Sequence, residues 1–92
     1  PGIRRDIALI VKESVTFEEV QSIIKNNQSS HLKETILFDV YRGEHLGGNQ
    51  KSLAIGLILQ DETQTLKDED VDISVGAIVK QLTDQLGATL RD

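Results

Sequence analysis

The spacing of the hydrophobic residues switches back and forth along this chain between two periods, and the order of the switches restricts the fold to few topologies. Alternation at every second residue is the period of a β-strand, whereas apolar residues three or four positions apart form one stripe of a helix. The sequence predicts, in order, a strand over residues 4–12, a helix over about 16–26, strands over 32–42 and 51–60, a helix over 68–86 and a short strand over 88–91. The predicted order of elements is therefore βαββαβ.

Local signals mark the ends of both helices. Thr16 and Glu19 have the spacing of a capping box, in which the threonine oxygen accepts from the backbone and the glutamate reaches back. The polar run from Asn26 to Ser30 is predicted to end the first helix. Gly87 is placed to end the second helix in a left-handed cap.

These elements pack together in one simple way. Each strand–helix–strand unit crosses over in the right-handed sense, and each helix has a single apolar stripe, so both helices should cover the same face of the sheet. The prediction is a ferredoxin-like α+β sandwich, a four-stranded antiparallel sheet with two helices on one face. In this topology the first and third strands are central, the second lies beside the third, and the other face of the sheet is bare.

Alternation assigns each strand residue to one of the two faces. The face toward the helices is predicted to carry Ile7, Leu9, Val11, Ile36, Phe38, Val40, Leu53, Ile55, Leu57 and Leu59. The open face is predicted to carry Asp6, Ala8, Ile10, Leu37, Asp39, Tyr41, Ser52, Ala54, Gly56 and Ile58. The small residues of the first and third strands should then form a shallow floor, with Asp39 and Tyr41 beside it.

The residue types on this open face suit a flat ring as ligand. Small side chains let a ring approach the sheet, and Tyr41, the one tyrosine of the chain, offers a stacking surface. The carboxylate of Asp39 accepts hydrogen bonds only, so it could take two from the N1–H and amino group of guanine. Single-stranded RNA is bound on open sheets in this way. The plain alternative is that Tyr41 reflects strand propensity and that Asp39 is simply solvated.

Composition narrows the class of protein. The chain has 92 residues, enough for one domain, with 38% hydrophobic and 27% charged residues, as in an ordinary globular domain. It has no cysteine, which excludes disulfides and cysteine-based zinc sites and fits a cytoplasmic protein. No apolar run approaches the roughly 20 residues that span a membrane. Because the chain begins with Pro1 and contains no methionine, we expect a fragment of a longer chain.

The net charge of −5 argues at first against a nucleic-acid partner. Six acidic residues and one lysine fall within residues 61–72, and the rest of the chain is neutral. Most of this acidity lies at the start of the second helix, where the helix dipole favours negative charge. A binding face elsewhere is therefore compatible with the charge, although non-specific binding to polyanions should be weak.

Constellations typical of catalysis or metal binding are absent from the sequence. His31 and His45 lie in different loops, without a cysteine or a carboxylate pair at ligand spacing, so we expect both to be surface residues. The three glycines within residues 43–50 do not form a phosphate-binding loop that opens a helix. This domain is therefore predicted not to be an enzyme and to hold no cofactor or metal.

Four stretches of the chain resemble a known family. They are PGIRRDIAL at residues 1–9, LFDVYRG at 37–43, KSLA at 51–54 and QLGATLR at 85–91. In this order and spacing they are similar to the ferredoxin-fold anticodon-binding domain, which closes the beta chain of bacterial phenylalanyl-tRNA synthetase. The resemblance covers essentially the whole chain, residues 1–92, and the paired motifs FDVYRG and KSLA are specific.

The resemblance implies a non-catalytic module that binds the anticodon stem-loop of the phenylalanine tRNA. In the family the first anticodon base, a guanine, stacks on the tyrosine that corresponds to Tyr41. The carboxylate two residues earlier corresponds to Asp39, the serine after the loop to Ser52 and the alanine of the first strand to Ala8. These four residues are among those that alternation places on the open face.

Charge and position add candidates for contacts to backbone phosphates, namely Arg4, Arg5, Arg42 and Lys51. The resemblance further implies, as partners, a parent beta chain and the alpha chain of an α2β2 synthetase. It implies ATP and magnesium for the parent enzyme and no cofactor for this domain. Neither a membrane nor DNA is an expected partner.

Two rival functions share this topology. An amino-acid-sensing regulatory domain would pair its sheets edge to edge and bind its ligand at the dimer interface, so it predicts dimerisation. A docking domain without a ligand would use Ile10, Leu37 and Ile58 as an exposed apolar patch. Titration with an anticodon stem-loop separates all three functions.

Overall fold

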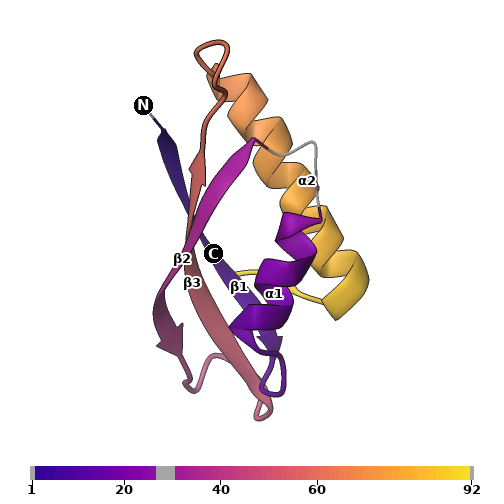
Figure 1. Ribbon diagram of the computed structural model, residues 1–92. Helices are drawn as coiled ribbons and strands as arrows, with labels where there is room; N and C mark the ends of the chain where they lie inside the picture. Colours follow the sequence, from indigo (N-terminus) through magenta and orange to yellow (C-terminus); the bar gives the residue numbers. More distant parts are fainter. Residues whose placement is uncertain (1, 27–30, 92) are drawn as a thin grey trace.

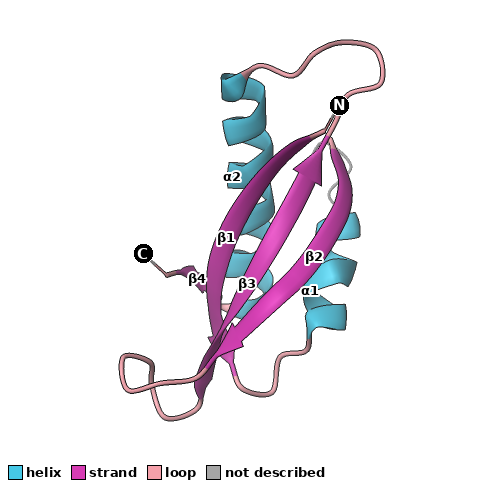
Figure 2. Cartoon of the chain, turned by 90° about the vertical axis from the view of Figure 1, so that its left-hand side faces the viewer, coloured by secondary structure: helices cyan, strands magenta, loops and turns pink. Residues whose placement is uncertain are grey.

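The protein consists of one four-stranded sheet and two helices, seen in a computed structural model that describes residues 2–26 and 31–91. The elements are β1 (Ile3–Lys12), α1 (Phe17–Lys25), β2 (Leu32–Tyr41), β3 (Gln50–Leu59), α2 (Asp68–Leu86) and β4 (Thr89–Leu90). The strand order is β2–β3–β1–β4, with every neighbouring pair antiparallel. Both helices lie on one side of the sheet (Figure 1), and the face turned toward the viewer in Figure 2 is left uncovered by them. The predicted ferredoxin-like α+β sandwich is confirmed.

The hydrophobic core lies between the sheet and the helices. Its strand residues come from alternate positions of the two central strands, and its helix residues come from one stripe of each helix. The fully buried members are Leu9 and Val11 of β1, Leu53, Ile55, Leu57 and Leu59 of β3, Val20 and Ile24 of α1, and Val71, Ile78 and Leu82 of α2. The core positions predicted for β3 are all confirmed. Within the described ranges, neither helix is long and apolar enough to cross a membrane.

Both helices begin and end largely where the local signals place them. The backbone N–H of Glu19 donates to the hydroxyl of Thr16 at 3.2 Å, and the N–H of Thr16 donates to the Glu19 carboxylate at 3.3 Å. The capping box is therefore confirmed. The second helix ends at Gly87, whose φ of 67° is left-handed as expected. Asn26 caps the first helix, and the remainder of its predicted polar run, residues 27–30, lies outside the described residues.

Removing the threonine of the capping box should measurably destabilise the fold. We expect Thr16→Ala to lower the free energy of unfolding by about 1 kcal/mol, because one backbone N–H of the first turn then loses its acceptor. Urea unfolding followed by circular dichroism measures this difference. Ser22→Ala, at an exposed position of the same helix, is the control and should leave the stability unchanged or slightly higher. An equal loss in both variants would contradict the capping role.

The second strand is where the prediction from alternation is partly wrong. The pairing of β2 with β3 shifts register twice, between Leu32 and Glu34 and again between Leu37 and Asp39. Such a shift inserts an extra residue into one strand and changes which face the following residues occupy. Leu37 pairs with buried Ile55, so it faces the helices rather than the open side.

Two further residues of β2 were assigned to the wrong face. Ile36 pairs with Gly56 and belongs to the open face, not to the core. Phe38 sits in the second shift without a partner and is 50% exposed instead of buried. Val40 pairs with Leu53 as predicted for the helix side, but it is 39% exposed near the end of the strand.

Candidate functional site

A row of three residues crosses the middle of the open face. Asp39 of β2 is paired with Ala54 of β3, and Ala54 is paired with Ala8 of β1. Directly opposed residues of antiparallel strands project from the same face of the sheet. The exposed carboxylate of Asp39 therefore stands at the edge of a floor made of two methyl groups. This is the arrangement that alternation predicted for these three residues.

The next row toward the end of β2 contains the tyrosine. Tyr41 is paired with Ser52, and Ser52 in turn is paired with Ile10. Ser52 is only 2% exposed, so it lies in the floor rather than above it. The ring of Tyr41 folds back over Gly43, where a Cβ would overlap the ring and its hydroxyl. The glycine thus leaves room for this orientation of the tyrosine.

Arg91 also belongs to this site, although sequence reasoning did not assign it a role. Its backbone N–H donates to the carbonyl of Ala8 at 2.8 Å, which places it beside β1 at the edge of the sheet. Its guanidinium carbon lies 4.2 Å from the centroid of the Tyr41 ring, a cation–π contact. The two outer strands are roughly 14 Å apart. The two side chains can meet across this distance because the side chains of the floor beneath them are small. The signal for Arg91 was its place at the end of the predicted last strand.

The four basic residues proposed for phosphate contacts do not gather on the open face. Arg4 shares that face with Asp6, to which its Nε donates at 2.7 Å. Arg5 alternates onto the helix side, where its nearest carboxylate is that of Asp68 at 3.6 Å. Lys51 is paired with buried Val11 and is also on the helix side of the sheet.

Arg42, just after β2, is bound by the carboxylate of Glu13, which follows β1 at the same end of the sheet. Its Nε donates to both carboxylate oxygens of Glu13 at 3.0 Å. This hydrogen-bonded guanidinium holds the pKa of Glu13 below its ordinary value of 4.5. Since a lowered pKa favours the ionised form, the pair is intact above pH 4.5 and contributes stability that is lost as acid protonates Glu13 at lower pH. Glu13 thus occupies the Nε and Nη2 edge of the Arg42 guanidinium, while the arginine side chain as a whole is 58% exposed.

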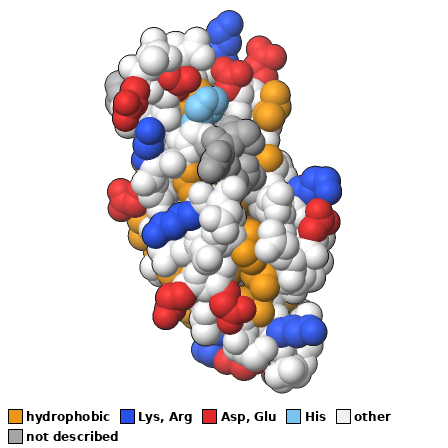
Figure 3. Space-filling model, turned by 45° about the vertical axis from the view of Figure 1, so that its right-hand side comes forward, with side chains coloured by type: hydrophobic (Ala, Val, Ile, Leu, Met, Phe, Trp, Pro, Cys, Tyr) orange, Lys and Arg blue, Asp and Glu red, His pale blue; other side chains and the backbone are white. Residues whose placement is uncertain are grey.

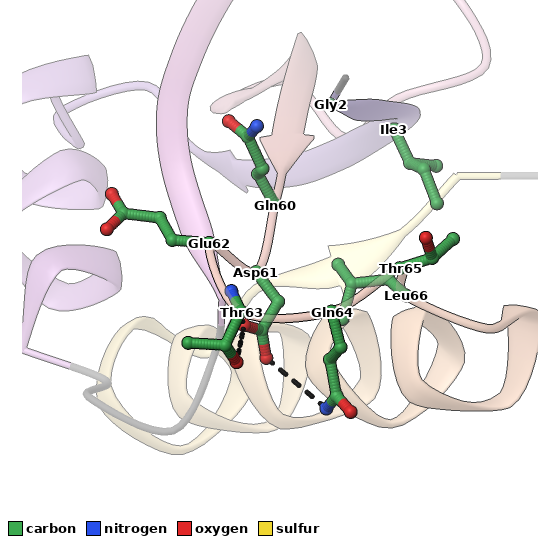
Figure 4. Close-up of a pocket in the computed structure, with 9 residues that line it drawn as sticks. All are labelled: Gly2, Ile3, Gln60, Asp61, Glu62, Thr63, Gln64, Thr65 and Leu66. Atoms are coloured by element: carbon green, nitrogen blue, oxygen red, sulfur yellow. Dashed lines mark hydrogen bonds between the residues drawn. The ribbon is translucent and has the colours of Figure 1, made fainter.

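A hollow at the far end of the sheet is a separate feature. It has a volume of about 550 Å³ and is lined by Gly2, Ile3 and residues 60–66 (Figure 4). Within it, the Asp61 carboxylate accepts from the backbone N–H of Thr63 at 2.8 Å and from the Thr63 hydroxyl at 2.7 Å. These two hydrogen bonds lower the pKa of Asp61. Ile3, which lines the hollow, is five residues from Ala8 on β1, a distance of about 17 Å at the rise of a strand. It is therefore separate from the row that contains Asp39.

The two histidines do not form a metal site with neighbouring residues. His31 is partly exposed, with its Nε2 at 3.5 Å from the carboxylate of Asp61. His45 lies exposed in the loop between β2 and β3. Within residues 2–26 and 31–91, no three His, Cys, Asp or Glu side chains come together at ligand distances.

The apolar patch expected for a docking domain is not assembled. Leu37 packs against the core on the helix side, whereas Ile10 and Ile58 are on the open face. On the helix side, acidic and basic side chains are scattered among apolar ones without a continuous patch of one charge (Figure 3). The open face with Asp39, Tyr41 and Arg91 therefore stays the candidate site.

Comparison with known proteins bears on this site. The family model described as "Ferredoxin-fold anticodon binding domain" matches residues 1–91. A phenylalanine–tRNA ligase beta subunit from Bacteroides fragilis is 44% identical over 91 residues, which is 99% of this chain and 11% of that protein. The corresponding subunit from Lactiplantibacillus plantarum is 41% identical over 99% of this chain and 11% of its own length. That of Psychrobacter arcticus is 41% identical over all of this chain and 12% of its own length. The chain thus spans about one ninth of these relatives.

Proposed function

This chain belongs to the ferredoxin-fold anticodon binding domain family, and from that premise we propose that its open sheet face binds the anticodon stem-loop of phenylalanine tRNA. The observation that carries the proposal is the shared face of Asp39, Tyr41, Ala54 and Ala8, which neither helix covers. A base can lie flat on this floor because its side chains are methyl groups. The proposed ligand is a single-stranded guanine, held at its Watson–Crick edge and on its ring face.

Asp39 and Tyr41 divide the recognition of the guanine between them. The carboxylate of Asp39 accepts from the N1–H and the exocyclic amino group, two donors that adenine, uracil and cytosine do not present together. Tyr41 provides the stacking surface, which any base can use. Specificity therefore comes from Asp39, and sequence-independent affinity comes from Tyr41.

Arg91 holds the place of the base in the free protein. Its guanidinium is a flat cation that already lies 4.2 Å from the centroid of the Tyr41 ring, while the ring folds over Gly43. The incoming guanine takes this position, and the displaced arginine is then available to a phosphate of the same loop. Ser52 is covered in the free protein, so it can contact the base only after this exchange.

The remaining basic residues would act at the rim of the interface. Arg4 is the one best placed, because it is on the open face. Arg5 and Lys51 alternate to the other side, so their contacts to phosphate would require the RNA backbone to pass over an edge of the sheet. At Arg42, a phosphate would compete with Glu13 for the Nε and Nη2 edge of the guanidinium.

Releasing Arg42 should strengthen RNA binding. We expect Glu13→Gln to raise the affinity for the anticodon hairpin about two- to fivefold at low salt, because the guanidinium no longer has an ionic partner and one negative charge is lost. The steeper salt dependence of an added phosphate contact would accompany the gain. Fluorescence anisotropy at several salt concentrations measures both quantities.

The control for this prediction makes the same change of charge at a distance. Asp84→Asn on α2 frees Lys80, whose Nζ donates to Asp84 at 2.8 Å, on an element that covers the opposite face of the sheet. It should raise the affinity less and leave the salt slope unchanged. If both variants gained equally, the effect would be one of net charge and not of Arg42.

The parent protein of such a module would be the beta subunit of a phenylalanine–tRNA ligase. Its ATP and magnesium, its alpha chain and an α2β2 arrangement belong to that parent, because this chain spans only 11% to 12% of the relatives' length. A cytoplasmic location stays a prediction. Binding of the isolated chain to the anticodon hairpin, compared with a hairpin of the same stem and a shuffled loop, tests the module by itself.

A further inference from the structure

A second aromatic ring stands on the open face, next to the proposed guanine pocket. The guanidinium carbon of Arg4 lies 5.2 Å from the centroid of Phe38, and half of the Phe38 side chain is exposed. Tyr41 and Arg91 form the same kind of pair. The two rings come from positions three residues apart on β2, which is about 10 Å at the rise of a strand. The open face therefore presents two arginine–aromatic pairs in a line.

The position of Arg4 in this pair is built into the sheet. Its Nε donates to the carboxylate of Asp6 at 2.7 Å, which holds the plane of the guanidinium. Beneath it lies Gly56, where a Cβ would come within 2.9 Å of Nη2 and 3.0 Å of Cζ. Any side chain at residue 56 would push the arginine away from the sheet. The pair of Arg4 and Phe38 thus depends on two other residues of the same face.

The outward position of Phe38 follows from the register shift in β2. Phe38 has no partner on β3, because the pairing passes from Leu37 directly to Asp39. The shift leaves Phe38 on the side of Arg4, away from the core. Phenylalanine is among the residue types most often buried in folded proteins. The fold instead holds it half-exposed, beside the carboxylate that we assign to guanine recognition.

We propose that Phe38 and Arg4 form a second nucleobase platform, which stacks the base of a nucleotide adjacent to the guanine in the same loop. This inference rests on the proposed function. Unstacked bases of single-stranded RNA are held on aromatic rings and on the guanidinium planes of arginine. Asp6 is already engaged by Arg4, and the phenyl ring makes no hydrogen bonds. The platform should therefore accept any base, in contrast to the guanine pocket.

The test combines one protein variant with one change in the RNA. We expect Phe38→Leu, which keeps apolar bulk but removes the ring, to weaken binding of the anticodon hairpin about five- to thirtyfold. Hairpins with an abasic site on one or the other side of the guanine are then titrated against both proteins. One of these two abasic hairpins, the one that lacks the base stacked on Phe38, should bind wild type and Phe38→Leu with equal affinity. Exchanging that nucleotide for any other base should change the affinity less than about threefold.

Matched controls separate stacking from folding. Phe17→Leu removes a ring from α1 on the helix side and should leave hairpin affinity unchanged at temperatures where circular dichroism shows both variants folded. If Phe38→Leu binds the hairpin as tightly as wild type while Tyr41→Ala does not, the second platform is wrong and the guanine pocket stands. If Phe38→Leu weakens every abasic hairpin as much as the intact one, stacking by Phe38 is also wrong. If neither the Phe38 nor the Tyr41 variant alters binding, both the second platform and the proposed function are wrong.

Discussion

Replacing Tyr41 with alanine is expected to weaken binding of the anticodon hairpin by about five- to 150-fold, which corresponds to about 1–3 kcal/mol of lost stacking. In the proposed complex the ring is the stacking surface for the guanine, and alanine would leave the base with water on that side. The floor of Ala8 and Ala54 cannot replace it, because methyl groups have no aromatic face on which a base can stack. Fluorescence anisotropy of a labelled hairpin at fixed salt measures the change.

Tyr41→Phe is the matched variant for this experiment. It keeps the ring and removes the hydroxyl that lies against Gly43, so the affinity should stay within about threefold of wild type if stacking is what matters. Because Arg91 stacks on the same ring, both variants also alter the free protein. An alanine variant that binds as tightly as the phenylalanine variant would show that the ring does not contact RNA.

Replacing Asp39 with asparagine should remove the preference for guanine. We expect Asp39→Asn to weaken the guanine hairpin by about 10- to 100-fold, since two hydrogen bonds to an ionised acceptor are lost or weakened. A hairpin with adenine in place of the guanine should bind both proteins equally and weakly. The difference between the two hairpins, measured for both proteins by isothermal titration calorimetry, isolates the contact from general effects of charge.

The control for Asp39 is again a change of charge away from the open face. Asp84→Asn removes one negative charge from α2 and should leave the ratio of guanine to adenine affinity as in wild type. If Asp39→Asn weakened both hairpins by the same factor, the carboxylate would act on the fold or the field and not on the base. A guanine preference retained in Asp39→Asn would likewise exclude the proposed pairing.

The fold could be predicted from the sequence because each element carries its own period. The alternation of Leu53, Ile55, Leu57 and Leu59 and the stripe of α2 agree with the structure, and the right-handed crossover leaves one topology. The resemblance to the anticodon-binding family is also confirmed over residues 1–91. Periodicity is reliable here because burial of one face dominates both central strands.

Periodicity failed on β2 for a physical reason. A register shift inserts a residue without changing the composition, and the run from Ile36 to Phe38 is apolar on both faces, so alternation cannot reveal it. Asp39 and Tyr41 both follow the shift, and their relative phase is intact. This is why they were placed on the correct face while Leu37 and Phe38 were exchanged.

The basic residues were proposed as phosphate contacts because of their charge, and charge does not determine the face of the sheet toward which a side chain points. Arg5 has the same parity as Ile7 and Leu9, so alternation already indicated the helix side, where it lies. Arg91 was missed because its contact with Tyr41 joins the two outer strands, fifty positions apart in the sequence. Only the strand order, with small residues between, brings these two side chains together.

The changes in amide chemical shift of the ¹⁵N-labelled protein during titration with the anticodon hairpin show directly which face of the sheet contacts the RNA. We expect the largest chemical-shift changes at Ala8, Asp39, Tyr41, Ser52 and Arg91, and we expect replacement of the guanine by adenine to abolish the change at Asp39. Signals of Lys80 and Asp84 on α2 should stay unchanged. Shifts centred on the helices, with the signals of Asp39 and Tyr41 unmoved at saturation, would contradict this expectation.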